Sequence, residues 1–220
     1  MDWHITQNQE YLSLLSRRLT EPRLMWVDQF VGIINDWVNK KKLNTKYSIN
    51  DIGCNVGHFY RGIEAINGMI DYCGYDISET YLEIARKHFP EAVFINFDIS
   101  GEMAPRVVDI AVISATLEHI DNHQSAIKYI FDTTNHLVVM RTFIGDGYIC
   151  DSCLTDSADE EYLIKQFTIS DLTRYPKKVG WNAFFVDDNA TEGKPKFVCN
   201  GRTVVRSQKI IVFTRNEKWI

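Results

Sequence analysis

Positive charge is scarce in this sequence. Its 24 Lys and Arg stand against 29 Asp and Glu, which gives a formal net charge of -5. Nucleic-acid binding depends on clustered Lys and Arg, so the charge balance disfavours RNA and DNA as partners. The sequence also lacks an apolar run as long as a membrane span, and its first residues, MDWHIT, do not resemble a secretion signal. We therefore expect a cytoplasmic protein without a nucleic-acid or membrane partner.

Cysteine is scarce as well, with five residues scattered through 220. An odd number at irregular spacing does not predict a disulfide framework. Cys150 and Cys153 have the spacing of a zinc knuckle or a redox pair, but a structural zinc site needs four ligands and no second such pair exists. We expect no metal site.

What the sequence does contain is an alternation of short apolar runs and helical patterns. Apolar residues recur at helical spacing after Pro22, from Leu24 to Trp37, which predicts an amphipathic helix. Five strands are then predicted at 47–52, 69–75, 92–96, 107–114 and 136–142, with helical stretches at 59–66, 82–89 and 126–131 between them. Repeated strand and helix predicts a parallel sheet with helices on both faces.

The C-terminal third has a different pattern. Residues 143–168 show no clear period, and we expect a lid loop there. Ser170 is expected to cap a helix that reaches Gly180 and is kinked or shortened by Pro176. Strands are predicted at 181–186 and 209–215, with a hairpin turn at Asn200 and Gly201. We divide the chain into an N-terminal helical extension, residues 1–46, and one globular domain, residues 47–220.

The stretch DIGCNVG, residues 51–57, follows the first predicted strand. A dinucleotide-binding loop needs the pattern G-x-G-x-x-G, but here its three positions hold Gly53, Asn55 and His58. The loop therefore offers no obvious cradle for a pyrophosphate. Asn55 tolerates positive backbone angles better than most residues, so we expect it to hold a tight turn where another chain uses glycine.

Carboxylates mark the ends of the first three predicted strands. Asp76 lies 23 residues after Gly53, at a position from which an acid can accept hydrogen bonds from ribose hydroxyls. Asp98, with Ile99 beside it, is placed to accept from an adenine amino group while the apolar neighbour packs on the ring. Each acid taken alone can equally be a strand-end cap. Together with Asp51 and without a phosphate loop, they indicate an adenosine-bearing ligand that carries no phosphate and can be cationic.

This set of residues resembles the class I S-adenosylmethionine (SAM) dependent methyltransferases, closely over about residues 47–142. DIGCNVGHF is similar to their glycine-rich first motif, and VDIAVISATLEHI to their fourth-strand motif, in which residues 117–120 are the most distinctive. The resemblance implies a three-layer Rossmann-like α/β sandwich with a mostly parallel seven-stranded sheet, an antiparallel last strand and additional N-terminal helices. Three departures are Asn55 in place of the middle glycine, a short third crossover, and Pro176 in the last helix.

The resemblance also implies roles for individual residues. The cofactor SAM is expected to contact Asp51, Gly53, Asn55, Gly57, Asp76, Ile77, Asp98, Ile99 and Ser114. Asp51 can alternatively shape the glycine turn through backbone contacts. His119 is the first candidate for a catalytic base because its ordinary pKa lies near working pH, and His123 is the second. A helix start without catalytic function is an equal alternative for His119. Tyr148, Glu161 and Tyr162 of the lid are expected to contact substrate.

The expected activity is methyl transfer to a hydroxyl or carboxyl group, or an amine, of a small molecule or sugar. Nucleobase amino methylation usually goes with an Asn/Asp-Pro-Pro-aromatic stretch after the fourth strand, which ISATLEHI does not resemble. Two alternatives remain open: a protein or peptide methyltransferase, and a non-catalytic SAM-binding partner subunit.

Overall fold

The structure, a computed structural model, describes residues 9–41, 46–64, 69–101, 106–154 and 161–215. The chain divides into two compact units, Met1–Asp98 and Ile99–Ile220, and each unit is described separately. Among the described residues, no helix is both long enough and apolar enough to cross a membrane.

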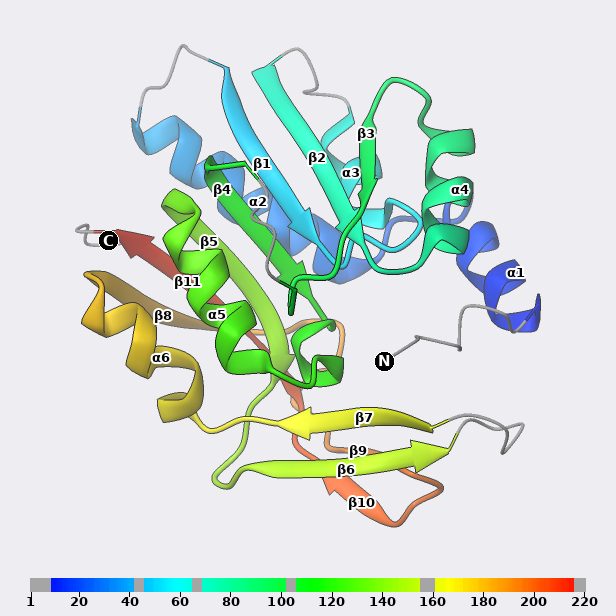
Figure 1. Ribbon diagram of the computed structural model, residues 1–220, viewed down its shortest axis with the longest axis vertical. Helices are drawn as coiled ribbons and strands as arrows, with labels where there is room; N and C mark the ends of the chain where they lie inside the picture. The colour runs from blue at the N-terminus through cyan, green and yellow to red at the C-terminus, as the bar shows by residue number, and fades with distance from the viewer. Residues whose placement is uncertain (1–8, 42–45, 65–68, 102–105, 155–160, 216–220) are drawn as a thin grey trace. The chain divides into compact units, whose positions relative to one another are not determined.

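The first unit contains four helices and three strands in its described part (Figure 1). Its elements are α1 (Gln9–Arg18), α2 (Met25–Lys41), β1 (Tyr47–Ile52), α3 (His58–Ile63), β2 (Ile70–Asp76), α4 (Glu79–His88) and β3 (Val93–Asn96). The strands are parallel and lie in the order β3-β2-β1. The helices α1 and α2 belong to the same compact unit as these strands, so the domain boundary placed after residue 46 stays a prediction.

Local signals in the sequence explain two of these helices. The Ser78 hydroxyl accepts a hydrogen bond from the Tyr81 amide, so Ser78 is the N-cap of α4. At Gly62 in α3, a Cβ atom would lie 2.5 Å from a methyl carbon of Val27 in α2. Glycine therefore permits α2 and α3 to pack closely. Residues 65–68, where the pattern predicts the end of α3, lie outside the described residues.

The second unit holds the remaining strands. Its elements are β4 (Val108–Ser114), the short 3-10 helix η3 (Leu117–His119), α5 (His123–Asp132), β5 (Thr134–Phe143), β6 (Ile149–Leu154), β7 (Glu161–Gln166), α6 (Ile169–Lys178), β8 (Trp181–Asp187), β9 (Lys196–Val198), β10 (Thr203–Val205) and β11 (Gln208–Arg215). The order β4-β5-β11-β8 has β4 parallel to β5 and β11 antiparallel to both of its neighbours. With β1–β3, these make up the predicted seven-stranded, mostly parallel sheet with an antiparallel last strand, so the predicted fold class is confirmed.

Two expectations for the C-terminal third were wrong. The stretch expected as a lid loop contains β6 and β7, which pair in antiparallel fashion from Ile149–Gln166 to Leu154–Glu161, while its residues 155–160 lie outside the description. Charged and polar residues in both strands hide the alternation by which strands are recognised. The helix α6 is capped by Thr168 and not by Ser170, because Thr168 and Asp171 form a reciprocal capping box. The helix also continues past Pro176 to Lys178.

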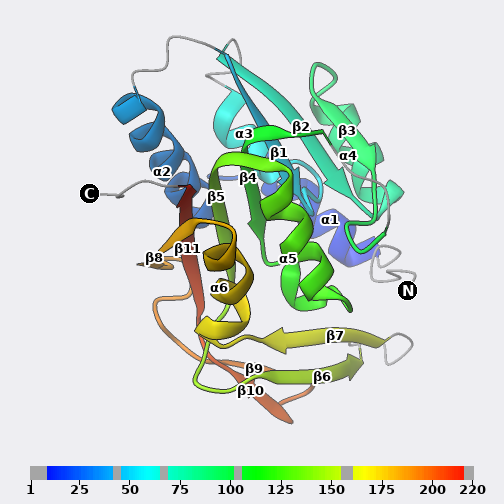
Figure 2. The same cartoon turned by 60° about the vertical axis from the view of Figure 1, so that its left-hand side comes forward.

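A disulfide, which the cysteine count did not predict, joins Cys153 to Cys199 across 46 residues. It links β6 to the turn between β9 and β10, where Asn200 and Gly201 have the positive φ angles of the predicted hairpin turn. Asp151 adds a second link by accepting hydrogen bonds from Arg202 and Thr203. Figures 1 and 2 both show β6, β7, β9 and β10 side by side. Around the disulfide lies a small apolar core of Phe143, Ile164, Val198 and Val205.

Thiol counting tests this pairing. Denatured, unreduced protein is expected to show three reactive thiols, from Cys54, Cys73 and Cys150, and five after reduction. Because the bond closes a long loop, Cys199→Ser should lower the free energy of unfolding by about 4 kcal/mol on the chain-entropy estimate, measured by urea denaturation. Cys150→Ser is the control, since Cys150 is exposed. Five reactive thiols before reduction would contradict the pairing.

Candidate functional site

The glycine-rich loop, residues 53–57, is built by backbone conformations that few residue types adopt. Gly53 and Gly57 have φ angles of 70° and 89°, and Asn55 has 52°, so Asn55 holds the left-handed turn expected of it. The Asn55 side-chain oxygen accepts a hydrogen bond from the next amide, that of Val56, at 2.8 Å. The amides of Gly53 and Cys54 both donate to the Tyr75 carbonyl, at 2.7 and 2.9 Å. The loop is thereby fixed against the end of β2.

Asp76, the last residue of β2, also holds the glycine-rich loop by hydrogen bonds. One carboxylate oxygen accepts the Asn55 amide and the other accepts the Ser78 amide, each at 2.9 Å. Burial raises the pKa of Asp76 to about 6, although these amide donors act in the opposite direction. A carboxylate has about four lone-pair sites, so Asp76 retains capacity to accept further hydrogen bonds.

Asp51 is a second buried carboxyl group in the same unit. The Tyr72 hydroxyl donates to it at 2.8 Å. Burial raises the pKa of Asp51 to about 7, the bond from Tyr72 lowers it, and the charge of Asp76 raises it. Two buried acids that feel each other's charge favour a cationic ligand. Sequence reasoning missed Tyr72, because an aromatic residue in a strand reads as core.

The structure brings Asp51, the glycine-rich loop and Asp76 together, and it places the other expected contacts of the first unit around them. Ile77 is 41% exposed although it is apolar, so its side chain is open to a ligand ring. The Asn96 amide group donates to the Ile77 carbonyl at 2.8 Å and fixes that turn. Asp98 is exposed after β3. At Gly57 a Cβ atom would lie 3.0 Å from the Phe89 ring, so this glycine also serves packing.

In the second unit, the expected contacts lie before and at the end of β4. Ile99 is buried, and Ser114 ends the strand. The Ser114 hydroxyl is buried and has no hydrogen-bond partner among the described residues. The next residue, Ala115, has a φ of 52°, which is strained for alanine, and its amide donates to the Arg141 carbonyl at 2.9 Å. Sequence reasoning missed Ala115, since nothing in its type signals a left-handed turn.

The loop after β4, residues 115–122 and called the acceptor loop below, is held by side chains from several strands. Glu118 is buried and accepts hydrogen bonds from Thr142 in β5 and Gln208 in β11, at 2.8 and 3.0 Å. The buried Lys165 of β7 donates to the Ile120 carbonyl and, at 2.7 Å, to the Asp121 carbonyl. Burial lowers the pKa of Lys165. These contacts hold the acceptor loop in place, although its regular structure is limited to the short helix η3.

His119 lies in this loop with its Nδ1 atom 2.6 Å from the Leu163 carbonyl of β7. A carbonyl accepts, so Nδ1 carries a proton in this contact and Nε2 is the other ring nitrogen. The Tyr162 ring meets the His119 ring edge-on, with 5.9 Å between the centroids.

The second candidate base, His123, begins α5 and stacks on Tyr148, with 5.9 Å between the ring centroids. Burial and the charge of Lys165 lower the pKa of His123, so the ring is neutral near pH 7. Its Nδ1 atom has no hydrogen-bond partner among the described residues. Each candidate histidine therefore lies beside one of the predicted substrate tyrosines. Glu161, in contrast, is exposed and accepts a hydrogen bond from Ser152.

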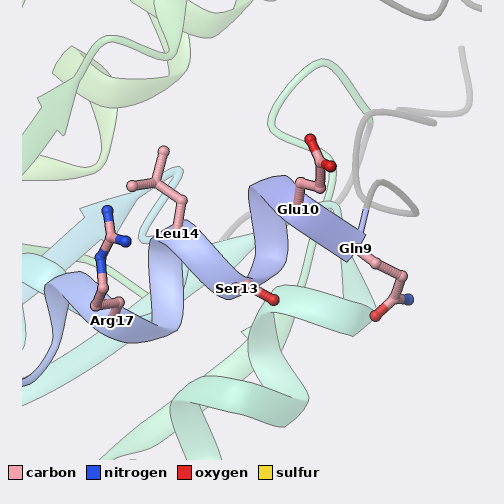
Figure 3. A pocket seen from close by; sticks show the side chains of 5 residues that line it. All are labelled: Gln9, Glu10, Ser13, Leu14 and Arg17. Carbon is pink, nitrogen blue, oxygen red and sulfur yellow. The ribbon is translucent and has the colours of Figure 1, made fainter.

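One open hollow of about 540 Å³ lies along α1 (Figure 3). Its lining residues are Gln9, Glu10, Ser13, Leu14 and Arg17. None of them is an expected site residue. No group of three or more potential metal ligands occurs in the described ranges of the chain.

Comparison with known proteins gives a family for part of the chain. Residues 50–136 match the sequence model of a family described as "Methyltransferase domain". This range begins in β1, includes the glycine-rich loop and the acceptor loop, and ends in β5. No curated protein sequence matches the chain.

Solved structures share the fold at low sequence identity. A SAM-dependent methyltransferase from Clostridium acetobutylicum ATCC 824 is 13% identical, with a TM-score of 0.62 over 86% of this chain and 92% of that one. CalS10 with bound SAM, an amino pentose methyltransferase from Micromonospora echinaspora, is 13% identical, with a TM-score of 0.61 over 93% and 97%. Magnesium protoporphyrin IX methyltransferase from Synechocystis PCC 6803 with bound SAM is 14% identical, with a TM-score of 0.55 over 92% and 81%.

The raised pKa of Asp51 predicts how stability changes with pH. Because the folded state favours the protonated acid, the contribution of Asp51 to stability is complete below the pKa of the unfolded chain, about 4, and is lost as pH rises toward 7. Asp51→Asn removes the charge and keeps an oxygen that accepts from Tyr72. We expect the variant to gain about 2 kcal/mol over the unsubstituted protein between pH 5 and pH 7.5, measured by urea unfolding without ligand.

Asp71→Asn is the matched control for this experiment, because Asp71 lies on the neighbouring strand β2 and is exposed. Its difference from the unsubstituted protein should stay constant between the two pH values. A constant difference for Asp51→Asn as well would show that Asp51 ionises in its ordinary range.

Proposed function

We propose that this chain, in which residues 50–136 match a methyltransferase family model, is a class I SAM-dependent methyltransferase that methylates a hydroxyl or carboxyl group of a small molecule or sugar. An amine of such a substrate is the second acceptor, and the likeness to an amino pentose methyltransferase supports it. Acidic composition supports a small acceptor over RNA or DNA.

The observation that carries the proposal is the hydrogen bond from His119 Nδ1 to the Leu163 carbonyl. The bond fixes the ring orientation and the tautomer, so Nε2 is the atom that receives a proton from the substrate. Bound SAM supplies an electrophilic methyl group, and the chain has to orient the acceptor and remove its proton. Glu118 and Lys165 keep His119 in place by holding the residues on either side of it.

We assign cofactor recognition to the first unit. Asp76 accepts from the ribose hydroxyls with the lone pairs that the Asn55 and Ser78 amides leave. The exposed Ile77 packs on the adenine ring, and Asp98 accepts from its amino group. Gly53 brings backbone against the ligand, and the negative charge of Asp51 and Asp76 favours the sulfonium cation. Contacts from Ile99 and Ser114 stay predictions of the same kind.

Calorimetric titration with SAM tests the assignment of Asp76. Asp76→Ala is expected to weaken binding about 10-fold to 100-fold, because hydrogen bonds to a charged acceptor are worth about 1.5–3 kcal/mol. Asp71→Asn should bind normally. Thermal unfolding of the variant shows that it is folded, and unchanged affinity in a folded variant would remove Asp76 from the site.

Release of S-adenosylhomocysteine in the presence of small hydroxyl, carboxyl and amine acceptors tests the activity and the base together. With the best acceptor, His119→Ala should lower turnover by about 100-fold or more, leave SAM affinity nearly unchanged, and abolish the acidic limb of the pH-rate profile. His136→Ala, at an exposed histidine of β5, is the control. A variant that keeps both the limb and most of its turnover would place the base elsewhere, with His123 next.

A further inference from the structure

The β9–β10 hairpin presents two apolar side chains to solvent. Phe197 and Val204 lie opposite each other in the antiparallel ladder and are 68% and 43% exposed. Among the described residues, Phe197 is the most exposed large apolar side chain. Because side chains alternate between the two faces of a strand, the neighbours Val198 and Val205 point the other way, into the small core around the disulfide. The hairpin therefore has a buried apolar face and an exposed apolar face.

Contacts with β6 hold this hairpin in a fixed position. Cys199, in its turn, is bonded to Cys153. Arg202 and Thr203, on the other side of the turn, donate to Asp151 of β6. Both ribbon views draw β10 in the lower part of the picture, next to β6 (Figures 1 and 2). Since the hairpin is already ordered, a partner that binds its exposed face pays little additional conformational entropy.

Positive charge surrounds the exposed apolar pair, although the chain as a whole is acidic. Residues 192–206 contain one acid and four cations, all of them exposed: Glu192, Lys194, Lys196, Arg202 and Arg206. Lys194 pairs with Glu192, and Arg202 pairs with Asp151. The Arg206 guanidinium pairs with no carboxylate among the described residues. The segment therefore has a net positive charge and is complementary to an anionic partner.

We propose that the exposed face of the β9–β10 hairpin docks on an anionic lipid surface. Phe197 and Val204 enter the boundary between headgroups and acyl chains, and the surrounding cations contact the acidic headgroups. The small size of the face supports lipid over protein, because a stable protein interface takes about 800 Å² and about 20–30 residues on each side. A peripheral contact of this kind needs no membrane-spanning run, which the sequence lacks.

Co-sedimentation with vesicles tests the proposal without SAM or an acceptor, so the result does not depend on the proposed activity. The unsubstituted protein should bind vesicles of phosphatidylcholine that contain about one-third phosphatidylserine, bind pure phosphatidylcholine about 10-fold more weakly, and lose binding as salt is raised. Phe197→Ala should weaken binding to the anionic vesicles about 10-fold, because the ring leaves water on docking. Arg206→Gln should weaken it about fivefold, the contribution of one cation near an acidic surface.

Two substitutions elsewhere in the second unit are the matched controls. Phe185→Ala removes a half-exposed aromatic ring from β8, and Lys178→Gln removes an exposed cation from α6. Both variants should bind the anionic vesicles like the unsubstituted protein. Thermal unfolding shows that all four variants are folded, as expected for exposed positions.

Three results would overturn the proposal. The first is that the unsubstituted protein does not bind the anionic vesicles, or that Phe197→Ala binds them as well as Phe185→Ala does. The second is binding of polyglutamate that Phe197→Ala weakens to the same extent, which would assign the face to an acidic peptide. The third is a dimer in sedimentation velocity that Phe197→Ala dissociates, which would assign the face to a second copy of this chain.

Discussion

The clamp formed by the Asp76 carboxylate is the contact on which the proposed cofactor site depends. It joins the turn after β1, through the Asn55 amide, to the start of α4, through the Ser78 amide. Three alternate residues of the loop, Gly53, Asn55 and Gly57, have positive φ angles, and such a backbone keeps its shape when its amides are fixed from outside. Asp76 therefore stabilises the loop, and only its remaining lone pairs are available to a ligand.

The acceptor loop of the second unit is also held by hydrogen bonds to residues of other segments. The Leu163 carbonyl and Lys165 reach the loop from β7, and Glu118 of the loop accepts hydrogen bonds from Thr142 of β5 and Gln208 of β11. Glu118 and Lys165 are buried and have hydrogen-bond partners, which is how a protein holds an irregular segment rigid. A rigid loop is what a base at His119 requires, because proton transfer depends on position before it depends on pKa.

The strands and helices of the sheet could be predicted because their apolar residues repeat with the right period, and β1 was predicted at its observed bounds. The positions of Asp51, Asp76 and Asp98 at strand ends were predictable because each strand is recognisable by itself, and their contact with a cofactor stays a prediction. Lys165 and the Cys153–Cys199 pair were not, since each contact joins segments about 45 residues apart and no local spacing encodes it. The spacing of Cys150 and Cys153 is typical of a pair, but Cys153 is bonded to Cys199. At α6, the prediction of Ser170 as the cap was wrong because Thr168 is an equally good cap residue, and the acid three residues after Thr168 completes a capping box.

The bond between Cys153 and Cys199 has a consequence for where and how the protein is made. Glutathione keeps thiols reduced in a cytosol, whereas secretory and periplasmic spaces favour disulfides. In protein produced in a reducing cytosol, only the Asp151 contacts and the apolar core join β6 to the β9–β10 hairpin. In protein produced in an oxidising space, the disulfide joins them covalently as well. Because β7 pairs with β6 and the Leu163 carbonyl contacts His119, the reduced and oxidised forms of the protein differ in a bond close to the acceptor loop.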